Sequence, residues 1–493
     1  MAEPLLLGVD VGTSQVKAAA FDLAGRERGR GAVSYRTHRP RPGWVEQDPD
    51  TWWAAVREAL AQVRAKAPLG DVAAMGVCGQ VNTHVLADER GRALHPAITW
   101  QDQRCAEVAT ALDASLSDER RRELWGGPFT VDASFALARA AWLRDEAPAA
   151  FAAARWLLLP KDLVNLRLTG EVGADPISAV GLVGRQRGYG EGILALVPEA
   201  AGLLAPLRAP TEVLGGVVAE DVGLPLGLPV VTATMDAWGN LHGSGVRRAG
   251  EGMEVAGTSE ILGVLAEGGP GARGVVSFPP VGGLRLHAGP TQAGGDALRW
   301  FASGQGAGLE EILARASRAP AGSDGALFLP HLAGERAPLW DPDLRGAFLG
   351  LGLDHGPEHL ARAVLEGVAF SARHVLETVD VAAGVVAADL VASGGAARSD
   401  LWCQIKADAL GRRLHRARVL DTGVLGAAMI AGVGAGLLAD LDEAAQRMVH
   451  VDRVFAPDPE PARRLDELYA VYRSLHPALA GAHRALTAAR RSA

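Results

Sequence analysis

Residues 5–23 read LLLGVDVGTSQVKAAAFDL. Two apolar runs flank a polar turn at Gly12, Thr13 and Ser14, a pattern that predicts a β-hairpin with a polar tip. Residues 253–265, MEVAGTSEILGVL, repeat the pattern around a second Gly-Thr-Ser turn. The two turns lie about half the chain apart, which predicts an internal duplication with one hairpin at the start of each domain.

The rest of the chain predicts an α/β fold in two domains. A length of 493 residues exceeds what one core usually supports. Strand-like stretches such as 72–78 and 228–233 alternate with helix-like stretches such as 51–64 and 357–379. A small-residue segment follows 228–233, and we place the domain boundary just after it. The expected divisions are an N-terminal domain, a C-terminal domain and a terminal helical extension, at residues 1–246, 247–456 and 457–493.

Composition argues against several classes of partner. A formal net charge of -8 disfavours nucleic acid and anionic membranes, which attract basic surfaces. The three cysteines form no CxxC pair, which fits a reducing cytoplasm, and the N-terminus carries no basic region typical of a signal peptide. The long uncharged run between Asp421 and Asp440 contains five glycines, and a buried helix is favoured over a membrane span. We expect small-molecule partners and a cytoplasmic location.

The first hairpin turn is a candidate phosphate site. Asp10 ends a strand-like run beside the turn, where a carboxylate can hold Mg²⁺ and the turn's N–H and hydroxyl groups can reach phosphate oxygens. One such turn is more often an ordinary hairpin turn. The second copy, with Thr258 at the matching place, favours two grips on a nucleotide triphosphate. Lys17, on the second run, joins the candidate nucleotide contacts.

Rival motifs are excluded by inspection. None of the four lysines follows a glycine, so the chain has no P-loop. It also lacks the protein-kinase signature set, the G-x-S-x-G elbow and H-E-x-x-H. The glycines at 432–436 lack the spacing of a dinucleotide fingerprint, which leaves close helix packing as the interpretation.

Asp236 is the candidate general base. It follows the strand-like stretch 228–233, and α/β proteins bind ligands where such strands end. Phosphoryl transfer needs one carboxylate to accept the proton of the attacking hydroxyl. A helix N-cap is the alternative role for this aspartate. Candidate sugar contacts cluster at residues 79–84 and 100–104, although Trp100 could equally lie in the core and His84 is better explained as the partner of an adjacent strand.

These segments in this order resemble the FGGY carbohydrate kinases, which include xylulose, ribulose, gluconate and glycerol kinases. The resemblance covers almost the whole chain. Its matching segments are the Asp10 turn, GWVEQDP at 43–49, WQDQR at 100–104, LPKD at 159–162, Asp236, the Gly257 turn, GERAP at 334–338, and GAFLGL at 346–351 continuing to HLARAVLE at 359–366.

The resemblance implies two ribonuclease-H-like domains of the actin and Hsp70 ATPase type, with ATP and substrate in an interdomain cleft. It gives Asp10 the role of metal-associated carboxylate and Asp236 that of catalytic base. It places nucleotide contacts in both halves of the chain and substrate contacts in the first. The implied nucleotide contacts are Gly12, Thr13, Ser14, Lys17, Thr258, Gly295, Gly394, Gly395 and Ser399, and the implied substrate contacts are Val81, Asn82, Trp100 and Asp236.

The preferred acceptor is less well marked. Many xylulokinases read Gln-Met-His-Gly where this chain has QVNT at 80–83, and asparagine after the catalytic aspartate where this chain has Ala237. Segments 43–49 and 159–162 resemble the xylulokinase branch more closely, so we expect a ketopentose. Ribulose, glycerol, a tetritol or a hexulose are alternative acceptors, and an actin- or Hsp70-type ATPase switch without sugar transfer is an alternative function. The oligomeric state is open, and a homodimer is compatible with the sequence.

Overall fold

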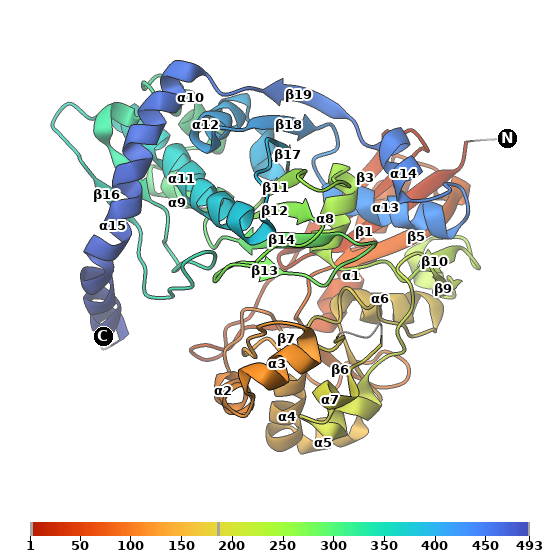
Figure 1. The fold of residues 1–493 in the computed structure, drawn as a ribbon. Coiled ribbons are helices and arrows are strands. Elements are labelled where there is room, and N and C mark those ends of the chain that lie inside the picture. The colour runs from red at the N-terminus through yellow and green to blue at the C-terminus, as the bar shows by residue number, and fades with distance from the viewer. Residues whose placement is uncertain (1–2, 185–187, 492–493) are drawn as a thin grey trace. The chain divides into compact units, whose positions relative to one another are not determined.

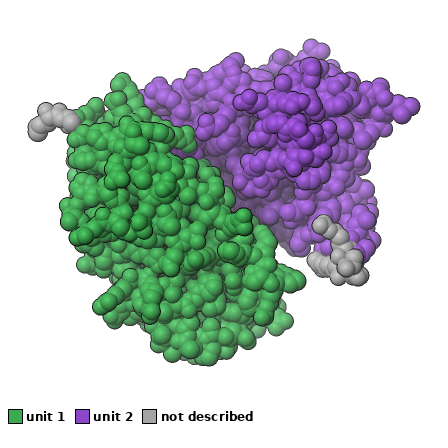
Figure 2. Space-filling model, turned by 180° about the vertical axis from the view of Figure 1, so that it is seen from behind, with its two compact units in different colours: residues 1–243, 423–449 green, residues 244–422, 450–493 purple. Residues whose placement is uncertain are grey.

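The computed structural model describes residues 3–184 and 188–491, which form two compact units. Unit 1 comprises Met1–Gly243 and Gly423–Val449, and unit 2 comprises Ser244–Thr422 and His450–Ala493. The two units are coloured separately in Figure 2. The sequence-based division was contiguous along the chain, whereas here the segment Gly423–Val449 belongs with the first unit.

Unit 1 is built on a six-stranded mixed sheet with the order β3-β2-β1-β5-β10-β9 (Figure 1). Strands β1, β2 and β3 form an antiparallel meander, β5 pairs parallel with β1, β10 pairs parallel with β5, and β9 is antiparallel at the edge. The first hairpin is therefore confirmed as β1 and β2. The bounds are β1 Leu5–Val11, β2 Gln15–Phe21, β3 Glu27–Ser34, β5 Val72–Gly79, β9 Val213–Gly216 and β10 Pro229–Val231.

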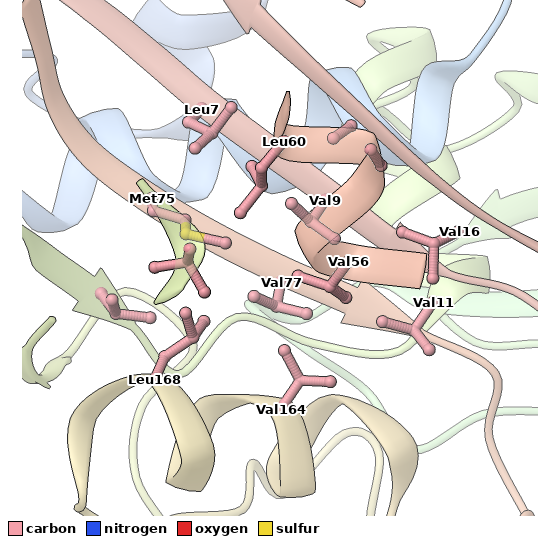
Figure 3. Packing of buried hydrophobic residues seen from close by; sticks show 14 of the residues in the cluster. Leu7, Val9, Val11, Val16, Val56, Leu60, Met75, Val77, Val164 and Leu168 are labelled. Atoms are coloured by element: carbon pink, nitrogen blue, oxygen red, sulfur yellow. The ribbon is translucent and has the colours of Figure 1, made fainter. Parts of the chain in front are cut away.

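Helices α1 (Pro49–Arg64) and α6 (Pro160–Thr169) cover one face of this sheet. The Asp48 carboxylate caps α1 by accepting from the N–H of Asp50, and apolar residues then recur every three or four positions. Figure 3 shows Val56 of α1 and Val164 of α6 among side chains of β1 and β5. This cluster is the main core of unit 1.

Helices α8 (Asp236–Ser244) and α13 (Thr422–Gly434) pack by glycine against unit 1 backbone. A Cβ on Gly8 of β1 would lie 1.9 Å from the carbonyl oxygen of Val424, and one on Gly426 would lie 1.9 Å from that of Gly239. Only glycine permits such approach, which explains why Gly423–Val449 joins unit 1. The interpretation of 421–440 as a buried helix is confirmed by α13.

The remaining elements of unit 1 form a smaller cluster around Leu86 and Leu137 and the connections to the sheet. They are β4 Glu46–Gln47, η1 Leu69–Asp71, β6 Val85–Ala87, β7 Ala97–Ile98, α2 Ala106–Ala114, α3 Asp118–Trp125, α4 Ala136–Glu146, α5 Pro148–Ala153, β8 Trp156–Leu158, α7 Glu191–Leu194, η2 Pro198–Leu203, η3 Glu220–Val222 and α14 Leu441–Met448.

Unit 2 repeats the strand arrangement in a seven-stranded sheet with the order β13-β14-β12-β11-β17-β18-β19 (Figure 1). Its hairpin β11–β12 pairs antiparallel with β14, its strands β17 and β18 run parallel to β11, and β19 is antiparallel at the edge. The predicted duplication therefore appears in the topology. The bounds are β11 Gly252–Ala256, β12 Glu260–Ala266, β13 Val276–Ser277, β14 Arg285–Pro290, β17 Asp389–Ser393, β18 Arg413–Ala417 and β19 Val451–Phe455.

Helix α11 (Pro357–Ala383) is the central helix of unit 2, with most of its residues buried. It begins at the proline where the sequence predicts a long helix, because proline at the first turn needs no N–H partner. The C-terminal helix α15 (Pro459–Arg491) packs against it. The other elements are α9 Gly295–Gly304, α10 Leu309–Ala316, η4 Ser323–Gly325, β15 Leu327–Leu329, β16 Ala347–Leu349, η5 Gly395–Arg398 and α12 Asp400–Leu410.

The α/β class predicted from the sequence is thus confirmed in both units. No helix among residues 3–184 and 188–491 has the length and hydropathy needed to cross a membrane.

Candidate functional site

The carboxyl ends of three parallel strands gather the acidic candidates of unit 1. Asp10 pairs with Cys78 across β1 and β5, and the end of β5 at Gly79 bridges Met235, which precedes Asp236. The strand that carries Asp10 and the segment that leads to Asp236 therefore lie on either side of β5, two inter-strand spacings or about 10 Å apart. Both residues are partly buried. A sheet edge where parallel strands end is where α/β proteins place ligands.

The tip of the first hairpin is fixed by side chains from distant segments. Trp100 donates its indole N–H to the hydroxyl of Thr13 (3.0 Å), and Gln47 donates to the Thr13 carbonyl (2.6 Å). The hydroxyl of Tyr35 donates to the carbonyl of Gly12. Burial, followed by the nearby Asp10 carboxylate, raises the pKa of Tyr35, so Tyr35 remains a neutral donor. Ser14 is exposed at the tip.

Lys17 lies on β2 directly opposite Asp10 in the antiparallel register. Residues opposite each other in such a pair have side chains on the same face of the sheet. Lys17 is partly buried. The structure thus places the candidate cation beside the candidate metal-associated carboxylate.

A chain of buried amides joins the β5 loop to Trp100. Gln80 donates to Gln47 (2.9 Å) and accepts from the hydroxyl of Thr83 (3.0 Å), and Thr83 in turn accepts from the backbone N–H of Trp100 (3.2 Å). The indole of Trp52 donates to the same Gln47 oxygen (3.0 Å). Trp100 is therefore partly exposed and hydrogen-bonded, rather than a core residue.

Asn82 projects from the loop that links β5 to β6. Its φ of 56° lies in the left-handed region, which asparagine tolerates better than most residues. Its amide donates to the hydroxyl of Ser134 (3.2 Å), and both Val81 and Asn82 are partly buried. His84, two residues on, is buried and pairs with Ile98, and burial followed by Arg139 holds its pKa well below the ordinary value. The interpretation of His84 as a structural partner fits this environment.

Asp236 is the first residue of α8. Its carboxylate accepts from the N–H of Ala237 (2.7 Å), and its carbonyl accepts from the amide of Asn240 (2.9 Å). The carboxylate lies at the N-terminus of α8, where it can cap the helix. It also lies at the same sheet edge as Asp10, where a general base is expected. Its place supports both roles.

A buried ionic triad of Lys161, Asp162 and Asp175 lies behind the segment that leads to Asp236. The Lys161 ammonium lies 2.6 Å from Asp162 and 2.9 Å from Asp175, and all three side chains are at most 2% exposed. Asp175 accepts from the hydroxyl of Thr234 (3.0 Å). The triad therefore anchors the backbone two residues before Asp236.

The charges within this triad are unequal. Burial lowers the pKa of Lys161, but the carboxylates of Asp162 and Asp175 outweigh burial and leave the pKa raised. Burial raises the pKa of Asp162, and Lys161 offsets this only in part. One ammonium thus faces two carboxyl groups. The sequence marked Lys161 and Asp162 only as a family segment, because Asp175 lies a helix away along the chain.

In unit 2, the second hairpin turn packs on the start of α9. The N–H of Gly295 donates to the carbonyl of Gly257 (2.9 Å), and a Cβ on Gly295 would lie 2.6 Å from that oxygen. Arg299 donates to the hydroxyl of Thr258 (3.2 Å), which is exposed. The structure therefore brings Thr258 and Gly295 together.

The loop after β17 meets the same hairpin. Gly394 has a φ of 84°, and a Cβ there would lie 2.4 Å from the carbonyl oxygen of Ala256 at the end of β11. Gly395 is exposed with open space around it, and Ser399 caps α12 by accepting from the N–H of Trp402 (3.2 Å). Five candidates, Thr258, Gly295, Gly394, Gly395 and Ser399, thus lie around one sheet edge of unit 2.

Unit 2 has its own buried triad behind the hairpin. Lys406 contacts Glu254 and lies 2.6 Å from Glu260, and all three side chains are nearly inaccessible. Burial raises the pKa of Glu260 to about 7, although Lys406 opposes the shift. The sequence does not reveal this triad because Lys406 lies 152 and 146 positions from its two glutamates.

The side chains near Asp10 suit a metal ion that takes most of its ligands from water and the substrate phosphates. Among residues 3–184 and 188–491, no three His, Cys, Asp or Glu side chains are grouped to bind a metal ion. Mg²⁺ is commonly bound by one or two carboxylates together with water and substrate phosphates. Asp10 beside the Gly12 turn fits that pattern.

Comparison with known proteins identifies both halves of the chain. Residues 5–242 match the N-terminal domain of the FGGY family of carbohydrate kinases, and residues 252–435 match the C-terminal domain. Xylulose kinase of Escherichia coli K12 is 32% identical over 442 residues, covering 87% of this chain and 90% of the relative. Glycerol kinase of Bordetella parapertussis is 31% identical over 485 residues, covering 92% and 93%.

Solved structures agree. The crystal structure of xylulose kinase from Rhodospirillum rubrum has a TM-score of 0.82 at 29% identity and covers 97% of this chain and 99% of its own. The predicted family and its two-domain fold are thereby confirmed. The chain therefore belongs to the FGGY carbohydrate kinases, enzymes that phosphorylate an alcohol group of a sugar or polyol at the expense of ATP.

Proposed function

We propose that this enzyme phosphorylates a ketopentose, with xylulose the favoured acceptor. The observation that carries the proposal is the arrangement at the end of β5 in unit 1. Asp10 lies on one side of this strand end and Met235, which precedes Asp236, on the other, while Asn82 follows β5 by three residues and Trp100 donates to Thr13 of the Asp10 turn. An indole face, an amide and a carboxylate are the groups that bind a small polyol. The xylulose kinase relatives support this acceptor class.

Asp236 would act as the general base. Its carboxylate accepts the proton of the attacking hydroxyl as that oxygen bonds to the γ-phosphorus, while the bond from the γ-phosphorus to the bridging oxygen breaks and ADP leaves. The N–H of Ala237 and the start of α8 hold the carboxylate in one orientation. The Lys161 triad fixes the backbone just before it.

The Gly12 turn and its counterpart in unit 2 would bind ATP. In this proposal the phosphate oxygens of ATP are bound in unit 1 by Gly12, Thr13 and Ser14, with Lys17 beside them. In unit 2 the phosphate contact is Thr258. Gly295, Gly394, Gly395 and Ser399 are assigned to the rest of the nucleotide. Asp10 would hold Mg²⁺, whose charge neutralises the phosphates during transfer.

We infer that the enzyme works in the cytoplasm on small molecules alone. ATP is its co-substrate, the three cysteines are free and buried, and the net charge of -8 disfavours nucleic acid. A homodimer is the assembly to test first, by sedimentation.

An acceptor screen tests the proposal. ADP release is measured with Mg·ATP alone and with xylulose, ribulose, glycerol, a tetritol and a hexulose. We expect xylulose to give the highest kcat/KM. Faster turnover of glycerol than of xylulose would identify the enzyme as a polyol kinase. Rapid ADP release that no acceptor stimulates would favour the actin- or Hsp70-type ATPase switch.

The base is tested by Asp236→Asn. A general base contributes about 10²- to 10⁴-fold in rate, so kcat should fall by that factor while ATP affinity stays near wild type. Asp221→Asn on η3 serves as a control, because this side chain is exposed and pairs with Arg57 on the surface. Wild-type turnover by Asp236→Asn would rule out the assigned role.

A further inference from the structure

Arg139 is a buried cation whose donors serve loops of the candidate acceptor site. It lies on α4 and is 0% exposed. Its guanidinium donates to the carbonyl oxygens of Asn82, Ile98 (2.7 Å), Thr99 (2.5 Å) and Ala133 (3.2 Å). One side chain thus reaches three separate segments of unit 1.

Two of these segments carry candidate acceptor contacts, and the third supports one of them. Asn82 is itself a candidate acceptor contact, and Ile98 and Thr99 immediately precede Trp100. Ala133 precedes Ser134, whose hydroxyl accepts from the amide of Asn82. The guanidinium therefore holds the backbone of the Asn82 loop and of the segment just before Trp100.

Asn82 depends on such support. Its positive φ costs about 1 kcal/mol or more for a residue other than glycine, so the conformation persists only if its surroundings hold it. The contact of Arg139 with the Asn82 carbonyl supplies that hold. His84 lies 3.1 Å from the same guanidinium and, being neutral, offers it a ring nitrogen as acceptor.

The geometry requires arginine. Four carbonyls in different directions match the fixed fork of a guanidinium, whereas a lysine ammonium presents its three donors from one point. Burial lowers the pKa of Arg139 to about 10, which leaves it charged at neutral pH. A buried charge held by neutral carbonyls is costly, so a purely structural site would be served more cheaply by an apolar side chain.

We propose that Arg139 is a positioning residue for acceptor recognition, acting through the backbone of Asn82 and of the Trp100 segment. The inference rests on the proposed function. It makes the sugar KM, and not the ATP KM, sensitive to this side chain.

The experiment compares wild type, Arg139→Lys, Arg139→Met and the control Arg362→Met. Arg362 is also buried and also donates to a carbonyl, that of Ala319 (3.1 Å), but it belongs to unit 2. We expect Arg139→Lys to raise the KM of the best acceptor about 10-fold, the equivalent of one or two lost hydrogen bonds, with the ATP KM within about twofold of wild type. Arg362→Met should lower the thermal midpoint and leave the acceptor KM unchanged.

A double-mutant cycle covers the case in which Arg139→Met does not fold. If Arg139 acts through Asn82, the effects of Arg139→Lys and Asn82→Ala on acceptor KM will be smaller together than their product. An Arg139→Lys enzyme with lower stability but unchanged acceptor KM and acceptor ranking would overturn the inference. Independent effects in the cycle would also overturn it. A wild-type enzyme that phosphorylates no acceptor refutes the proposed function instead, and this inference with it.

Discussion

The triad of Lys161, Asp162 and Asp175 permits a sharp test of the fold behind the catalytic residue. Replacing Lys161 by methionine keeps most of the side-chain volume but removes the only ammonium between two carboxylates, 2.6 and 2.9 Å away. Removing one partner of a buried ion pair costs about 3–5 kcal/mol, because the remaining charge has no compensation. We expect Lys161→Met to destabilise the protein by this amount at pH 8.

The loss should depend on pH with a definite sign. Without Lys161, burial holds the pKa of Asp162 in the folded protein above the unfolded value of about 3.9. A group with a raised folded pKa favours folding when protonated, so this contribution is lost as pH rises through the folded pKa and returns as pH falls. The deficit of Lys161→Met should therefore shrink by about 1.4 kcal/mol or more between pH 8 and pH 5.

The assay is urea unfolding of wild type and variants at both pH values, followed by the fluorescence of the tryptophans. The matched control is the triple variant Lys161→Met, Asp162→Asn, Asp175→Asn, which removes all three charges. It should recover at least half of the lost stability, because no uncompensated charge remains. A deficit that is the same at pH 8 and pH 5, or a triple variant no more stable than Lys161→Met, would refute the reasoning.

Two further predictions concern packing and acid sensitivity. Gly8→Ala places a Cβ 1.9 Å from the Val424 carbonyl oxygen and should lower the free energy of unfolding, measured in urea, by about 2 kcal/mol or more. Gly202→Ala is the control, because open space surrounds Gly202, and it should change the free energy of unfolding by less than about 1 kcal/mol. Equal effects would contradict the packing of α13. Burial, aided by Arg473 and neighbouring histidines, lowers the pKa of His374 to about 3 from its ordinary 6.5. Below pH 6.5 the unfolded chain therefore binds a proton that the folded protein does not. The free energy of unfolding should fall as the pH is lowered, by about 2 kcal/mol at pH 5. His374→Leu should show a shallower loss of stability between pH 7 and pH 5, and an unchanged pH profile would contradict this assignment.

Local signals in the sequence predicted much of the fold. The two hairpins, the strand at Val72–Gly79 and the start of α11 at Pro357 all appear where the alternation and the proline indicate them. These elements depend on residues close in sequence. Family membership was equally accessible, because its segments keep their order along the chain.

Contacts between distant residues were not predictable in this way. The place of Gly423–Val449 in unit 1 depends on glycines of β1 and α8 meeting α13, and nothing in the helix pattern specifies which sheet it covers. Arg139 appears in the sequence as one of several charged residues on an alanine-rich helix, and only the fold reveals the carbonyls around it. The candidate acceptor residues were found from the family resemblance, whereas the side chains that hold them were not.

The return of α13 to unit 1 also constrains how the protein is made. On the ribosome, residues up to Gly243 emerge first, yet the glycine surface of β1 has no covering helix until the chain has been translated as far as Val449. The first unit must therefore wait without α13, with the sheet face that this helix covers exposed, while most of the second unit is synthesised. A truncated transcript that ends between the units would yield an insoluble fragment, and chaperone dependence should be greatest at that stage of translation.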